Sequence, residues 1–133
     1  MKTRTLIEMG ENGTFSIFTP DLKNTIWGEG DTVLEAKKDF LNSYEEVLLS
    51  YKDEGKKIPN ELKNLEFVYR YDIASLFNYC NFLNVSKLAK TIGVNPSLLR
   101  QYKAGNTYIS EKQAKKIETG LHQIGEQLLS VSL

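Results

Sequence analysis

Apolar residues recur with two different spacings along the chain, and each spacing predicts one kind of element. At 14–18 they alternate with polar residues, as a half-buried strand requires, while 3–9 is rich in strand formers and 24–30 is compatible with a strand. Strands are predicted at 3–9 and 14–18, joined through the turn residues of 10–13, and at 24–30. An aromatic and β-branched run at 65–71 predicts a fourth strand.

Between the third and fourth strands the spacing changes to that of a long helix. Thr32 and Glu35 have the spacing of a capping box, and Asp31 adds negative charge where the helix dipole is positive. The apolar positions that follow at i, i+3 and i+4 form a stripe wide enough to pack across a sheet. Gly55 is the predicted end of this helix. The first part of the chain is therefore predicted to be a β-β-β-α-β unit that ends near Tyr71.

The rest of the chain has helical spacing only. Asp72 is a predicted cap for a helix whose apolar face runs to Leu83 and includes Cys80. Ser110 and Gln113 are a predicted capping box for the last helix. The apolar positions of that helix alternate spacings of three and four, which fits a coiled-coil seam or a helix packed within its own domain: they are Ala114, Ile117, Leu121, Ile124 and Leu128. The predicted fold class is α+β, with residues 1–71 as one unit and 72–133 as an all-α domain.

The segment from Ser86 to Gly105 has the most specific pattern in the chain. Gly93 suits the left-handed end of one short helix, and Asn95 with Pro96 suits the start of the next. Ala89 is small enough for two helices to approach closely. The segment is therefore predicted to be helix, tight turn, helix.

These residues resemble the helix-turn-helix of the XRE/lambda-repressor-like family, over roughly 72–130. That family lays the second helix in the major groove, with the N-terminal half of the helix toward base edges. The resemblance implies the following DNA-binding residues: Asn95, Ser97, Arg100 and Gln101 toward bases, and Lys87, Lys90, Lys103, Thr107 and Tyr108 toward phosphates. The alternative is a helical hairpin that packs against protein.

Charge is divided unevenly although the whole chain has a formal net charge of zero. Residues 1–83 carry 10 lysines and arginines against 14 aspartates and glutamates, a net charge of −4. Residues 84–133 carry 7 basic and 3 acidic residues, a net charge of +4. This division fits different partners for the two parts, with a polyanion for the basic part.

Residues 20–59 resemble the HicB antitoxin family. The steps that carry the resemblance are Pro20-Asp21-Leu22, Gly30-Asp31-Thr32 and Glu35-Ala36. The chain departs from that family where Lys23-Asn24-Thr25 replaces the usual Pro-Gly-Cys. The resemblance covers about 3–71 and implies a truncated RNase H-like unit that neutralises a small basic ribonuclease toxin, HicA. It also implies a DNA-binding tail that represses the operon.

The acidic unit supplies candidate residues for contact with such a toxin: Glu8, Glu11, Trp27, Glu29 and Asp31. Carboxylates attract a cationic partner, and a large aromatic residue can anchor the centre of an interface. In the alternative interpretation, the acidic residues belong to the solvated surface. Trp27 then fills the core between the sheet and the helix.

The same composition argues against other classes of function. Asp21, Glu29 and Asp31 are the carboxylates that a two-metal nuclease would use, but they do not form matched pairs on the strands. We therefore expect no enzyme activity, no metal and no cofactor. The single cysteine excludes an internal disulfide, and no apolar run approaches the roughly 18 residues that span a bilayer. We expect a cytoplasmic protein with no membrane partner.

The sequence therefore predicts a repressor-antitoxin that binds operator DNA and a HicA-like toxin. The alternative is a stand-alone transcription regulator whose first domain dimerises or senses a ligand. Operators are commonly read by dimers, so we expect a homodimer or a larger assembly. Either the sheet edge of the first unit or the apolar seam of the last helix is the predicted dimer contact.

Overall fold

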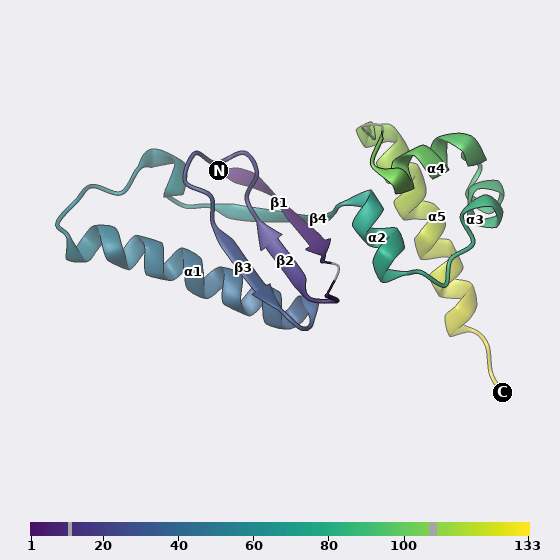
Figure 1. Cartoon of the computed structure of the whole chain (residues 1–133), viewed down its shortest axis with the longest axis horizontal. Coiled ribbons are helices and arrows are strands. Elements are labelled where there is room, and N and C mark those ends of the chain that lie inside the picture. The colour runs from purple at the N-terminus through teal and green to yellow at the C-terminus, as the bar shows by residue number, and fades with distance from the viewer. Residues whose placement is uncertain (11, 107–108) are drawn as a thin grey trace. The chain divides into compact units, whose positions relative to one another are not determined.

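The structure is a computed structural model that describes residues 1–10, 12–106 and 109–133. It confirms the α+β class, because a four-stranded mixed sheet formed by the N-terminal strands is followed by helices (Figure 1). The chain forms two compact units, Met1–Tyr79 and Cys80–Leu133. The boundary predicted after Tyr71 therefore lies too early. The reason is helix α2 (Ile73–Tyr79), which packs on the first strand and hydrogen-bonds the Met9 N–H through the Ser75 hydroxyl.

The first unit is built on strands β1 (Lys2–Met9), β2 (Phe15–Phe18), β3 (Trp27–Gly30) and β4 (Glu66–Tyr71). Their order across the sheet is β3-β2-β1-β4. The predicted hairpin is confirmed, since β1 and β2 pair antiparallel, and β3 adds antiparallel to β2. Strand β4 pairs parallel with β1, after a crossover through helix α1 and a 3-10 turn, η1 (Asn60–Leu62).

Helix α1 (Val33–Asp53) begins where the sequence predicts. The Thr32 hydroxyl accepts the Glu35 N–H at 3.1 Å, as an N-cap does. The Glu35 carboxylate accepts the N–H of Asp31 at 3.1 Å, one residue before the position that a capping box uses. Gly55, just past the helix, adopts φ +66°, which glycine reaches without steric cost.

Helix α1 covers one face of the sheet (Figure 1). Its buried Ala36 and Phe40 meet the inward residues of β1 and β2, Ile7 and Ile17. The helix and β3 approach so closely that a Cβ at Gly28 would lie 2.4 Å from the Phe40 Cα. Gly28 therefore sets the spacing between the helix and the sheet.

The second unit contains helices α3 (Val85–Ile92), α4 (Pro96–Ala104) and α5 (Glu111–Leu129). The predicted caps of these helices are confirmed: Gly93 and Gly105 end α3 and α4 with φ +75° and +76°, while Asn95 and Ser110 begin α4 and α5. The buried core of this unit comprises Leu88, Ala89, Val94, Leu99, Tyr102 and Ile117. The four predicted helix ends thus follow from residues within one turn of each end.

Two sequence expectations need correction here. The helix predicted to run from Asp72 to Leu83 ends at Tyr79, so Cys80 is a half-buried residue in the following turn and not part of a helix face. The seam predicted on α5 is not one continuous surface. Ile117 is buried in the core of its own unit, whereas Leu128 is 63% exposed.

Candidate nucleic-acid interface and candidate protein-binding face

The outer side of helix α4 carries polar side chains three and four residues apart. Ser97, Arg100 and Gln101 are exposed and stand at i, i+3 and i+4, which places them on one side of the helix. Leu99 and Tyr102 lie on the opposite side and are buried in the core. Three of the four predicted base-reading residues are therefore brought together on a solvent-facing surface.

Asn95, the fourth predicted base reader, has a second role. Its side-chain oxygen accepts the Ser97 N–H at 2.9 Å and the Leu98 N–H at 3.3 Å, so that oxygen caps the helix. Its amide NH₂ remains the group through which it can donate to a ligand. Asn95 is exposed and lies at the same end of α4 as Ser97.

Arg100 is held by a contact that the sequence pattern does not reveal. Its Nη1 donates to the Ser86 hydroxyl at 3.1 Å, which ties the middle of α4 to the first turn of α3. Ser86 stands two residues after the N-cap of α3, Asn84, whose side chain accepts the Lys87 N–H. A guanidinium anchored at one nitrogen keeps its other donors available in a fixed direction.

The two helices of this segment also carry exposed cations. Lys87 and Lys90 lie on α3, and Lys103 lies in the last turn of α4. Among the residues that the structure describes, none of these three nor Arg100 forms an ion pair. Their charge is therefore uncompensated locally, as a surface that meets phosphates requires. Thr107 and Tyr108, the remaining predicted phosphate contacts, lie outside the described residues.

The turn between α3 and α4 is fixed from a third helix. The Nζ of Lys116, on α5, donates to the Gly93 carbonyl at 2.7 Å. A cation at this position also complements the negative end of the α3 dipole. Sequence reasoning missed Lys116 and Ser86, because no local pattern reports which distant carbonyl or guanidinium a side chain meets.

The first unit presents an open sheet face on the side away from α1. Strand register aligns Leu6, Phe18 and Trp27 in one row across β1, β2 and β3. Trp27 is 48% exposed and its ring stacks on Phe18, with ring centroids 5.3 Å apart. The alternative that Trp27 fills the core is therefore wrong. It forms an accessible aromatic surface instead.

Two of the predicted acidic residues share this face with Trp27. Glu8 and Glu29 stand in the next row of the register, on either side of Ser16. Burial, and then the charge of Asp72, raise the pKa of Glu8 above its ordinary value. Glu29 is exposed. The open face thus joins an aromatic pair to two carboxylates.

Asp31, another predicted acidic residue, is not part of that group. Asp31 is exposed at the start of α1, where its N–H is bound by Glu35, and it stands outside the register of β3. Glu11 lies outside the described residues. Among the described residues, Glu8 and Glu29 are the predicted acidic residues that share the face of Trp27.

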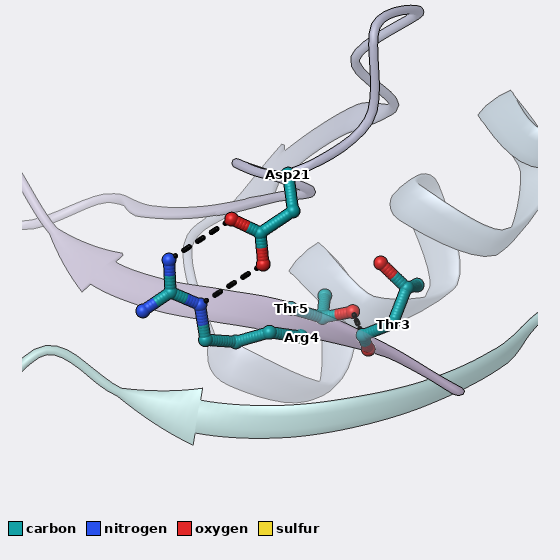
Figure 2. A network of polar contacts seen from close by, with 4 residues as sticks. All are labelled: Thr3, Arg4, Thr5 and Asp21. Carbon is teal, nitrogen blue, oxygen red and sulfur yellow. Dashed lines mark hydrogen bonds and ion pairs between the residues drawn. The ribbon is translucent and has the colours of Figure 1, made fainter.

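An ion pair fixes the loop after β2 against β1 (Figure 2). Asp21 accepts both Arg4 Nη2, at 3.1 Å, and Arg4 Nε, at 3.3 Å. This two-point geometry matches the planar guanidinium fork. Asp21 is one of the carboxylates that a two-metal nuclease would use, and here it is engaged by a cation. Within residues 1–10, 12–106 and 109–133, no group of three or more His, Cys, Asp or Glu is placed to hold a metal.

Two other features bear on chemistry at the surface. Burial raises the pKa of the Cys80 thiol, which lowers its thiolate fraction near neutral pH. None of the helices, over the part of the chain that the structure describes, is long and apolar enough to cross a membrane.

Comparison with protein-family models, curated proteins and solved structures gives no match to this chain.

Proposed function

We propose that the chain is an antitoxin and repressor, in which the second unit binds operator DNA and the first unit binds a small basic ribonuclease toxin. The observation that carries the proposal is the outer face of α4. Ser97, Arg100 and Gln101 project together from a helix whose opposite side is buried, and α3 and α4 carry exposed lysines that form no ion pair within the described residues. In this proposal α3, the turn at Gly93 and α4 form a helix-turn-helix.

The side chains on α4 are of the types that read base edges. Arginine binds the O6 and N7 of guanine through two donors, and glutamine binds adenine in the same way. Arg100 reads a base with the donors that Ser86 does not use, and Lys87, Lys90 and Lys103 neutralise phosphates. The +4 charge of residues 84–133 favours this partner.

The DNA-binding part is tested on the full chain with a duplex from its own promoter. Arg100→Ala is expected to weaken specific binding by about 1–3 kcal/mol and to relax preference at one base position. Lys103→Ala is expected to weaken all sequences alike and to reduce the slope of log K against log salt by about 1. Lys115→Ala is the matched control, because it removes one exposed cation from α5, where Lys115 already pairs with Glu118.

A full chain that binds its own promoter no better than a random duplex at low salt contradicts this part of the proposal. If Arg100→Ala and Lys115→Ala weaken DNA binding equally, Arg100 contributes only its positive charge and reads no base. Ser86→Ala tests whether the Ser86 hydroxyl positions the Arg100 guanidinium for its contact with a base. It should lower specificity less than Arg100→Ala, since the guanidinium remains.

The toxin-binding part rests on the open face of the first unit. The HicB resemblance of residues 20–59 motivates it. The Trp27–Phe18 pair supplies an apolar centre, and Glu8 with Glu29 supplies negative charge beside it. A protein that grips RNA must present cations, so an acidic face with an aromatic anchor complements it.

Co-expression of the full chain with the small gene beside its own tests this part. Rescue of growth is expected for the parent chain and for Arg100→Ala, and is expected to fail for Trp27→Ala. Phe82→Ala, which removes a 77% exposed aromatic residue from the other unit, is the control and should rescue. A neighbour that is harmless alone, or toxic and unaffected by the parent chain, favours the stand-alone regulator instead.

A further inference from the structure

The two edges of the sheet are treated differently. At the β3 edge, the outward Glu29 N–H donates to the Asp39 carboxylate of α1 at 2.9 Å. The Asp39 side chain thereby occupies one of the N–H groups that another strand would use. Strand β4 forms the opposite edge, and no further strand lies beyond it among the residues that the structure describes.

The backbone of β4 divides into an inner and an outer set of groups. The N–H of Glu66 donates to the Met1 carbonyl and the N–H of Asp72 donates to the Ile7 carbonyl, both on the side of β1. Because a ladder uses alternate residues, the N–H and carbonyl groups of Phe67 and Tyr69 point away from β1. These are the groups of an unpaired edge.

One of these outward groups has a side-chain partner. The Arg70 guanidinium turns back and donates through Nη1 to the Tyr69 carbonyl at 3.1 Å. An exposed side chain thus occupies the acceptor that a strand would use. Arg70 and Glu66 are both exposed, and neither forms an ion pair within the described chain.

We propose that β4 pairs antiparallel with β4 of a second copy of this chain, with Val68 on the two-fold axis. In this register Phe67 and Tyr69 of each copy exchange backbone hydrogen bonds. Glu66 lies opposite Arg70 of the second copy, and the symmetry repeats this pair. Arg70 then leaves the Tyr69 carbonyl to the incoming strand and takes Glu66 of the second copy as its partner.

The charge pattern selects this register from those that the backbone allows. The outward groups belong to odd-numbered residues, so odd-numbered residues must face odd-numbered residues. Centring on Tyr69 places Glu66 opposite Asp72, two like charges, and centring on Phe67 places Glu66 opposite Val68. Only the register centred on Val68 sets opposite charges across both ends and apolar residues between them, which favours cross-strand pairing.

The proposal rests on the sheet edge and is independent of what either unit binds. It is tested first by sedimentation of the full chain at about 50 µM, a concentration at which a weak dimer with micromolar Kd is populated. A dimer is expected. Glu66→Arg and Arg70→Glu are each expected to raise its dissociation constant by about tenfold or more, because each places like charges opposite one another twice.

Combining the two charge reversals gives the most discriminating test of the register. An equimolar mixture of the Glu66→Arg chain and the Arg70→Glu chain should form a heterodimer, since every cross-strand pair is again of opposite charge. The doubly substituted chain should recover the homodimer. Lys38→Glu and Glu45→Lys, which reverse exposed charges on α1, are the matched controls and should leave dimerisation unchanged.

Cross-linking checks the register directly. In a Cys80→Ser background, Val68→Cys should form an intermolecular disulfide, because facing residues of a non-hydrogen-bonded pair lie about 4.5 Å apart. Glu66→Cys should not, since residue 66 faces residue 70. A monomer at this concentration, a dimer that ignores both charge reversals, or a cross-link through position 66 and not 68 each overturns the proposal.

Discussion

Gly120 offers the sharpest test of how the second unit is packed. A Cβ added at this position of α5 would lie 2.1 Å from Cγ2 and 2.6 Å from Cβ of Ile92, at the end of α3. Carbon atoms in good contact stand about 3.5–4.0 Å apart, so the two helices must separate or Ile92 must leave its rotamer. Ile92 is β-branched and its χ1 is stiff, so a change of its rotamer is costly.

The expected magnitude follows from two opposing terms. Inserting a methyl group into a packed contact costs about 1–3 kcal/mol, while replacing glycine by alanine within a helix returns about 1 kcal/mol. Gly125 isolates the second term, because a Cβ there meets nothing within 4 Å. Gly125→Ala should therefore raise the free energy of unfolding by up to about 1 kcal/mol. The free energy of unfolding of the Gly120→Ala chain should be lower than that of the Gly125→Ala chain by the full packing cost of about 1–3 kcal/mol.

Urea unfolding of the full chain, followed by circular dichroism at the helical signal, measures this difference. Tryptophan fluorescence provides an internal control, since the single tryptophan, Trp27, lies in the first unit and should report an unchanged midpoint. Ile92→Ala removes the closest atom, so it should cost less in the Gly120→Ala chain than in the parent. A Gly120→Ala chain as stable as Gly125→Ala would refute the direct α3–α5 contact.

Three further changes test other features of the structure. Gly28→Ala should destabilise the first unit by about 3 kcal/mol in thermal unfolding, because the obstacle 2.4 Å away is the Phe40 Cα and backbone cannot rotate aside. Lys116→Met should cost the second unit up to about 1 kcal/mol by removing the cation at the Gly93 carbonyl, and an unchanged urea midpoint would contradict that role. The raised pKa of Glu8 means that folding favours its protonated form, so its contribution to stability is full below the ordinary value of 4.5 and is lost as pH rises through the folded-state pKa. Glu8→Gln should therefore be more stable than the parent at pH 7 and lose that advantage near pH 4, as measured by Trp27 fluorescence in urea.

The sequence alone determined the features that depend on residues a few positions apart. The caps at Thr32, Asn95 and Ser110 and the left-handed ends at Gly93 and Gly105 are local, because each joins groups within one turn of a helix. Helical spacing likewise placed Arg100 and Gln101 on the outer side of α4, since burial of Leu99 and Tyr102 fixes the opposite side.

Tertiary structure decided everything that depends on which distant group meets which. The sequence predicted four strands, but not that β4 would pair parallel with β1 and leave its other edge open. It left Trp27 between core and surface, because alternation gives two faces and only the position of α1 tells which face is covered. The lack of room for a Cβ at Gly120 beside Ile92, and the hydrogen bond from Lys116 to the Gly93 carbonyl, both arise between α5 and the end of α3. Composition and spacing do not predict such pairings, because the pairings arise only when the helices pack.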